Sequence, residues 1–300
     1  MNLRWIGSAR ARLESAVRAL GWAVVRLLRW AAATWRSPDR NDRLAVLIHS
    51  FDGYKRFWGP VLHLSAASLP PELPVFFASE REPATGNGAT SILTGKGAFG
   101  DRMRKAVDHL RGLGYEYVLY LQEDMWISEE IDSRRFREFI DLMETHKLDA
   151  LKLADLAAPP PEIDELGRRC SRLGRDGLAA EVRWFGSHDY VFSHHTTIFR
   201  SSFLAEVLTV ASLFRRVKPL QQEQFCSAYL KRRSVASDRS GGRYRIAGFA
   251  DEPLLRYIHA STRGRLTDAA RTLLEERGLA HLYAPDLPGE FYPDRRGQIQ

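Results

Sequence analysis

Short apolar segments alternate with longer segments of helical pattern, and this alternation constrains the fold more than any other feature of the chain. The short segments are β-rich and lack polar alternation, as expected of strands that are buried on both faces. They cover residues 44–48, 74–78, 117–121 and 150–153. The segments between them predict helices at 54–69, 101–113 and 132–147. Because strands and helices in this order build parallel sheets, the sequence predicts an α/β fold with a mostly parallel sheet and flanking helices.

The pattern changes after residue 153. A proline run at 159–161 and an Arg- and Gly-rich run to Gly177 predict an excursion from the sheet. Further strands are predicted at 181–185, 192–200 and 243–250, and further helices at 202–213 and 221–232. Asp101 is the predicted N-cap of helix 101–113. Two cysteines exclude a disulfide framework and a cysteine-rich zinc site.

The positive charge of the chain is concentrated at its N-terminus. The net charge is +7, and residues 1–43 hold nine arginines against three acids. The remainder is therefore close to neutral, which excludes a basic nucleic-acid-binding groove on the folded region. No nucleic-acid partner is expected.

Residues 1–36 predict a basic amphipathic helix, with an apolar stripe from Ile6 to Trp35 and arginines opposite. Arginines interrupt the apolar run too often for a transmembrane span or a signal peptide. Such a helix suits an anionic membrane interface, a coiled coil in a homo-oligomer, packing on its own domain, or a mitochondrial-type presequence. Residues 37–42 then predict a polar linker, 43–285 the folded domain and 286–300 an irregular tail.

Two adjacent acids, Glu123 and Asp124, follow the predicted strand 117–121. Ligands of open α/β sheets bind beyond the carboxyl ends of the strands. Acids placed there are costly unless a positive charge meets them. A Mg²⁺ or Mn²⁺ ion that bridges to substrate phosphates would meet this need. The alternative is an acidic cluster at a helix start, because Ser128, Glu129, Glu130 and Asp132 follow.

The order of four segments resembles the GT-A glycosyltransferases, which move a sugar from a nucleotide-sugar donor. Segment 117–125 resembles the strand that carries the DxD motif, and 192–204 resembles the element S-L-Q-x-x-I-W-R-x-x-x-L of some bacterial members. Segment 221–225 sits where such proteins carry an acid on a helix, and His259 where many carry a metal-binding histidine. The resemblance covers roughly residues 43–262 and implies a GT-A-like, Rossmann-like sheet. The chain departs from a strict DxD motif, since position 122 is Gln122.

The resemblance implies roles for particular residues. A divalent cation, Mn²⁺ or Mg²⁺, would be bound by Asp124 and His259, and the donor by Glu123 and Asp124. Glu223 would be the general base that deprotonates the acceptor hydroxyl, with Asp189 as the rival base. Asp52, just after the first strand, would meet the base or ribose of the donor.

Other polar residues are candidates on chemical grounds. Lys96, Arg102 and Arg104 follow a glycine-rich stretch and could neutralise a diphosphate, or could be solvated surface charges. His194 and His195 are candidates for hydrogen bonds to the acceptor or the diphosphate. Together with His188 and Asp189 they lack the helical spacing of a zinc-binding pair.

The sequence therefore predicts a membrane-associated, inverting glycosyltransferase of polysaccharide biosynthesis. It would transfer a sugar to a hydroxyl of a cell-envelope glycan or lipid-linked acceptor, from a peripheral position on the cytoplasmic face of the cell membrane. One alternative is a nucleotidyltransferase, although residues 49–53 lack the Gly-rich basic signature usual after the first strand. Another is a catalytically inactive scaffold of the same fold, for which Gln122 argues.

Overall fold

The computed structural model describes residues 43–153, 170–173, 180–184, 192–213, 219–237, 244–249, 255–262 and 265–283. The predicted helix 1–36, linker 37–42 and tail 286–300 lie outside the described residues, and so does Asp189. The predictions for them stay predictions. None of the helices in the described ranges combines the length and the apolar composition of a membrane span.

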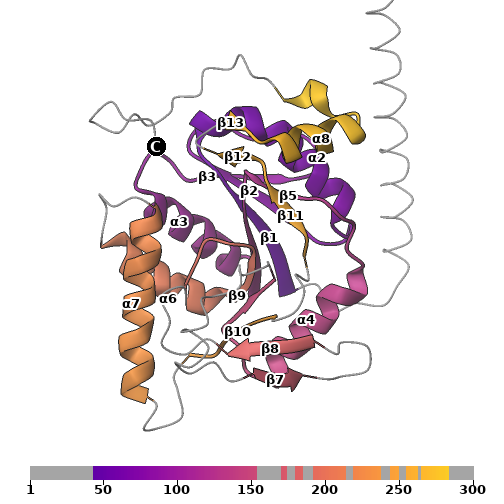
Figure 1. Ribbon diagram of the computed structural model, residues 1–300. Coiled ribbons are helices and arrows are strands. Elements are labelled where there is room, and N and C mark those ends of the chain that lie inside the picture. Colours follow the sequence, from indigo (N-terminus) through magenta and orange to yellow (C-terminus); the bar gives the residue numbers. More distant parts are fainter. Residues whose placement is uncertain are drawn as a thin grey trace, which may run out of the picture.

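One nine-stranded sheet in the order β3-β2-β1-β4-β9-β6-β10-β8-β7 forms the centre of the described part of the chain (Figure 1). Strands β9 and β8 run opposite to the other seven. The predicted mostly parallel, Rossmann-like α/β sheet is therefore confirmed. The strands are β1 (Leu44–His49), β2 (Val75–Ser79), β3 (Thr90–Leu93), β4 (Tyr117–Gln122), β6 (Ala150–Lys152), β7 (Cys170–Leu173), β8 (Ala180–Trp184), β9 (Thr197–Arg200) and β10 (Ile246–Phe249).

Helices cover both faces of the sheet (Figure 1). One face packs against α3 (Phe99–Gly112), α6 (Ser201–Ser212) and α7 (Pro219–Ser237). The other packs against α2 (Trp58–Ser68), α4 (Ser133–Thr145) and α8 (Asp268–Glu276). Side chains of β1 alternate between the two cores, Ala45 and Leu47 on one face, Val46 and Ile48 on the other. Burial on both faces is why this strand is apolar throughout.

Two small antiparallel pairs lie outside the main sheet: β5 (Met125–Ile127) with β11 (Tyr257–His259), and β12 (Ser261–Thr262) with β13 (Arg265–Leu266). Two 3₁₀ helices, η2 (Asp52–Phe57) and η3 (Ala280–Leu282), complete the described elements. The sequence pattern does not predict β3, β5, β7 or α8. β5 has only three residues, too few for a periodic pattern, and β3 lies within the glycine-rich stretch.

Two local predictions are wrong. Helix α3 begins at Phe99, so Asp101 lies in its first turn and does not cap it. The predicted strand 192–200 is reduced to β9, which begins at Thr197. The residues before it bond to α7 instead of to a neighbouring strand, because the backbone N–H of Phe192 donates to the Ser227 hydroxyl, 3.1 Å away.

Candidate active site

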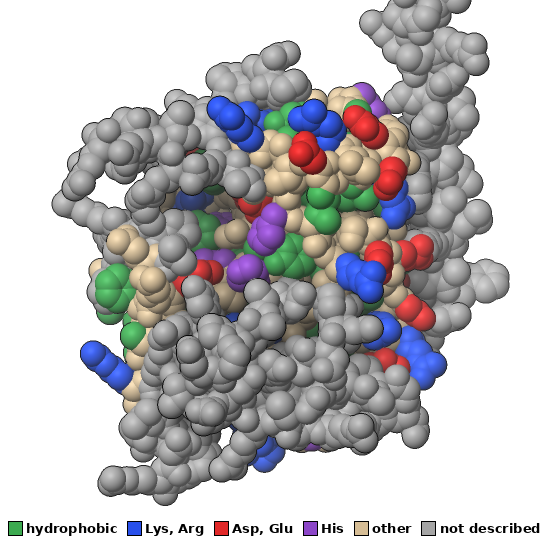
Figure 2. Space-filling model, in the orientation of Figure 1, with side chains coloured by type: hydrophobic (Ala, Val, Ile, Leu, Met, Phe, Trp, Pro, Cys, Tyr) green, Lys and Arg blue, Asp and Glu red, His purple; other side chains and the backbone are tan. Residues whose placement is uncertain are grey.

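The ends of several strands meet at one edge of the sheet. The parallel strands β1, β4 and β6 finish there, at His49, Gln122 and Lys152. The antiparallel strand β9 begins at the same edge, because Thr197 pairs with Tyr120 of β4 and with Lys152 of β6. Figure 2 shows histidine side chains beside acidic ones in a hollow of the face that it presents.

The acidic pair occupies the turn between β4 and β5. Glu123 is only 7% exposed, and the Trp126 indole N–H donates to its backbone oxygen over 2.9 Å. Burial, and after it the charge of Asp124, raises the pKa of Glu123 to about 8, while Ser50 and Arg102 oppose the shift. Glu123 is thus a buried acid and Asp124 a half-buried one, and nearby groups offset only part of the cost of burying their charges.

His259 lies beside Asp124 because of the β5–β11 pairing. His259 is opposite Met125, and the Ala260 N–H donates to the Asp124 backbone oxygen over 2.7 Å. Burial raises the pKa of the Asp124 carboxyl, and His259 is the main influence that lowers it. The Asp124 Oδ1 atom is buried without a hydrogen-bond partner among the described residues. Asp124 and His259 are therefore the side chains of this site that could bind a metal ion.

Glu223 reaches the same region from α7. It is partly buried, and its Oε1 accepts a hydrogen bond from the backbone N–H of His194. Burial raises the pKa of Glu223, while the His194 N–H and the charge of Lys152 lower it. A solvated helix acid would show neither the burial nor the backbone contact. The Glu223 carboxylate is thus held by the His194 N–H and is partly shielded from solvent.

Tyr120 shows that the acids from the two sides share one site. Its side chain is fully buried, and its pKa is raised well above the usual value, first by burial. The charges of Glu123, Glu223 and Asp124 all raise it further. The Tyr120 hydroxyl is therefore within electrostatic reach of the acids that end β4 and of the acid on α7.

The two adjacent histidines differ in their surroundings. The His194 ring is 3% exposed and packs edge-on against Phe99 and Phe192, with centroid distances of 4.7 and 5.3 Å. Both of its ring nitrogens are buried without a hydrogen-bond partner in the described part of the chain. His195 instead contacts the Tyr257 hydroxyl through Nδ1 at 2.9 Å. Of the two rings, that of His195 makes a polar contact at the site.

Two residues of this site are not indicated by the sequence motifs. The Tyr257 hydroxyl lies between His195 and His259, 3.4 Å from Nε2 of the latter, and so links the residues before β9 to β11. Lys152 is 2% exposed at the end of β6, and its Nζ donates to the Ser193 hydroxyl over 3.3 Å. The sequence did hold one indication of Lys152, because it is a single lysine inside the apolar segment 150–153. Lysine is almost never fully buried without a partner, so such a position indicates a specific contact.

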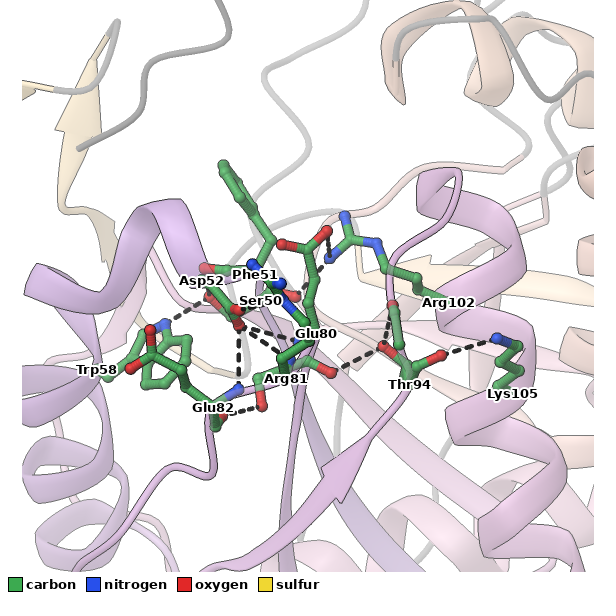
Figure 3. Close-up of polar contacts among 12 residues, drawn as sticks. Ser50, Phe51, Asp52, Trp58, Glu80, Arg81, Glu82, Thr94, Arg102 and Lys105 are labelled. Carbon is green, nitrogen blue, oxygen red and sulfur yellow. Dashed lines mark hydrogen bonds and ion pairs between the residues drawn. The ribbon is translucent and has the colours of Figure 1, made fainter. Parts of the chain in front are cut away.

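Asp52 and Arg102 hold the loops that follow β1 and β2 together (Figure 3). Asp52 Oδ1 accepts from the backbone N–H groups of Glu80 and Arg81, each at 3.2 Å. Arg102 is buried, donates to the Ser50 backbone oxygen over 3.0 Å and lies 3.7 Å from the Glu80 carboxylate. Both side chains thus have structural contacts at the edge where a donor was predicted to bind.

The remaining basic candidates have the features of surface charges. Lys96 is exposed in the loop before α3. Arg104 pairs with Asp108 of the same helix, with 3.8 Å between the charged atoms. The surface-charge interpretation therefore suits both residues better than diphosphate binding.

The buried His194 ring gives an acid-stability prediction. Burial lowers its pKa to about 3, below the unfolded value of about 6.5, so the unfolded state binds more protons as pH falls below 6.5. Stability from this ring is present above pH 6.5 and is lost toward pH 3. In His194→Phe, the fall in unfolding free energy between pH 7 and pH 4 should shrink by on the order of 3 kcal/mol, measured by urea titration. The exposed His109→Gln variant should keep the wild-type slope, and an unchanged slope in His194→Phe would contradict the assignment.

Comparisons with known proteins identify no family. No family model matches the chain, and no curated protein matches it. One similar solved structure is 4-diphosphocytidyl-2C-methyl-D-erythritol synthase, 10% identical, covering 79% of this chain and 99% of that one, with a TM-score of 0.37. Another is mannose-1-phosphate geranyltransferase from Thermus thermophilus, 16% identical, covering 73% and 76%, with a TM-score of 0.31. At these scores the likeness says nothing about this chain's activity.

Proposed function

We propose that the protein is a glycosyltransferase of the GT-A type. It would transfer a sugar from a nucleoside-diphosphate donor, with inversion, to a hydroxyl of a cell-envelope glycan or lipid-linked acceptor. The observation that carries the proposal is the acidic pair after β4, with Asp124 beside His259, together with Glu223, because all three acids act on the Tyr120 hydroxyl. Inverting sugar transfer to a hydroxyl needs a group that stabilises the charge of the leaving diphosphate. It also needs a positioned carboxylate that accepts the proton of the hydroxyl.

The donor side of the site fits a divalent cation. Asp124 Oδ1 is buried without a partner among the described residues, and an imidazole stands beside it. No group of three His, Cys, Asp or Glu side chains in the described ranges is placed to hold a metal. Mg²⁺ and Mn²⁺ accept few protein ligands and fill the rest of the shell with substrate oxygens and water. Asp124 and His259 would hold the ion, which would supply positive charge to the leaving diphosphate.

Glu223 would carry the proton transfer. As the acceptor oxygen attacks the anomeric carbon, its proton passes to the Glu223 carboxylate and the bond from that carbon to the diphosphate oxygen breaks. The electron pair of that bond leaves with the nucleoside diphosphate. Burial raises the pKa of Glu223 and so makes it a stronger base than a solvated carboxylate. The His194 N–H fixes the direction of the carboxylate.

The test is a donor panel with two readouts. The purified chain is incubated with nucleoside-diphosphate sugars, and release of nucleoside diphosphate is measured with and without glycan acceptors. In parallel, nucleoside triphosphates and sugar 1-phosphates are supplied and pyrophosphate is measured. Nucleoside diphosphate release supports the glycosyltransferase. Pyrophosphate release would replace it with a nucleotidyltransferase, and donor binding without either product would indicate an inactive scaffold.

The membrane part of the proposal rests on residues 1–36. Deletion of this segment should release the protein from anionic vesicles, because the rest of the chain is close to neutral. Each basic residue near an anionic surface contributes about 1 kcal/mol, so binding of the full chain should also weaken with salt. Leu20→Glu with Leu27→Glu places charge in the apolar stripe and should abolish co-sedimentation with vesicles. If the double variant instead turns an oligomer into a monomer in lipid-free light scattering, the helix is a coiled coil.

A further inference from the structure

Lys152 is a buried lysine that the proposed reaction does not yet use. It ends β6 on the sheet face that packs against α3, α6 and α7, since it alternates with Leu151 and shares the face of Ala150. Only 2% of it is exposed. A buried ammonium is costly unless a negative charge or hydrogen bonds compensate it. Packing alone therefore does not explain why a lysine is buried at this position.

The contacts of Lys152 lead to Glu223. Its Nζ donates to the Ser193 hydroxyl over 3.3 Å. The next residue, His194, donates its backbone N–H to the Glu223 carboxylate. The same two-residue segment thus binds the lysine of β6 and the acid of α7. The opposite charges lie close enough that each shifts the other's pKa toward the ionised form.

Among the described residues, three other titratable groups act on this pair, and each is neutral near pH 7. Tyr120 and Cys226 also face Glu223, and burial raises the pKa of both, that of Cys226 to about 12. His195 faces Lys152, and burial lowers its pKa to about 4. Among the described residues, Lys152 is therefore the positive charge that opposes Glu223.

We propose that Lys152 is a positioning residue for Glu223, whose ammonium keeps the carboxylate ionised and in place beside His194. This inference rests on the proposed function, in which Glu223 is the general base. Burial, opposed by the charge of Glu223, lowers the pKa of Lys152 to about 7, so the ammonium is present at the acidic end of the working range. There it opposes protonation of Glu223, the event that would stop catalysis from the acid side.

Lys152→Met tests this through the pH profile. Loss of the charge should raise the midpoint of the acidic limb of kcat by about one pH unit, as expected for one nearby opposite charge. At pH values below the wild-type midpoint, kcat should fall about 10-fold relative to the wild type, with donor KM changed less than about two-fold. Lys152→Arg keeps the charge and should keep the midpoint. If the acidic midpoint of kcat in Lys152→Met equals that of the wild type, the proposal is wrong.

Lys105→Met is the matched control. Lys105 is exposed on α3, its Nζ donates to the Thr94 backbone oxygen over 2.8 Å (Figure 3), and it is not among the charges that shift the pKa of Glu223. The substitution removes one lysine charge of the same chain, so net charge changes equally in both variants. Its acidic limb should match the wild type. A shift equal to that of Lys152→Met would mean that net charge, and not the local pair, sets the limb.

A second measurement separates this inference from the proposed function. The full chain is labelled with ¹³C at glutamate carboxyl groups, and Glu223→Gln identifies the Glu223 signal. Its NMR titration midpoint should rise in Lys152→Met whether or not any donor is turned over. A rise without transfer activity would retain the Lys152–Glu223 pair and reject the glycosyltransferase. Transfer activity with an unchanged Glu223 midpoint would support the glycosyltransferase and reject the Lys152–Glu223 pair. If Lys152→Met does not fold, Lys152→Gln replaces it in the same titration.

Discussion

Asp124→Asn is expected to lower sugar transfer about 100-fold or more while the protein stays folded, because charge stabilisation of a leaving diphosphate is worth several kcal/mol. The amide keeps the size of the side chain and removes the charge beside His259. Since Asp124 is half-buried and desolvation raises the pKa of its carboxyl, loss of the charge should not destabilise the fold. The measurement is the initial rate of nucleoside diphosphate release at saturating donor and acceptor, with a thermal melt of each protein.

Glu129→Gln is the matched control for this variant. Glu129 is exposed, lies in the segment after β5 and pairs with Arg256 at 3.2 Å, so its loss should leave the rate within about two-fold of the wild type. Wild-type turnover in Asp124→Asn would reject the site. Chelation by EDTA tests the metal separately. If EDTA leaves the wild type active while Asp124→Asn abolishes transfer, the carboxylate acts without a metal ion.

The sheet was the predictable part of this fold. Strands β1 and β4 are buried on both faces, so nearly every residue in them is apolar. Such a continuous apolar run can be recognised in the sequence alone. Glu123 and Asp124 could be placed at the carboxyl end of β4 for the same reason, since the apolar run stops there. Burial of Glu123 and the direction of the pKa shifts of both acids came only from the structure.

The partners of the acids were not predictable in the same way. His259 lies beside Asp124 only because β5 pairs with β11, and these strands are three residues each. Such short strands carry no periodic signal, and they lie far apart in the sequence. The family resemblance suggested His259, but nothing in the local pattern indicated Tyr257, which links His259 to His195.

Asp52 and Arg102 illustrate a different limit. Their positions after β1 and at the start of α3 placed them correctly near the carboxyl edge of the sheet. Their hydrogen-bond partners are backbone atoms of neighbouring loops, which a sequence does not reveal. A charged residue at such an edge can bind a ligand or hold the loop that binds it. Only the contacts show that these side chains already hold the loops.

Glu223→Gln is expected to lower kcat by about 10²- to 10⁴-fold, the usual contribution of a general base, with little change in donor affinity. The glutamine keeps an oxygen that can accept from the His194 N–H, so the fold around α7 should persist. A base acts in the transition state, so the loss should appear equally in kcat and in kcat/KM, with the KM for the donor unchanged. Steady-state kinetics with varied donor at saturating acceptor measure both.

The rival base provides the comparison. Asp189 lies outside the described residues, and the assignment rests on Glu223, which is partly buried, accepts the His194 N–H and faces the charge of Lys152. If Glu223 is the base, Asp189→Asn should leave most of the turnover. A loss confined to Asp189→Asn, with Glu223→Gln near the wild type, would move the base to Asp189. In that case the acidic limb of the pH profile would persist in Glu223→Gln, whereas a base at Glu223 requires that limb to disappear with the carboxyl group.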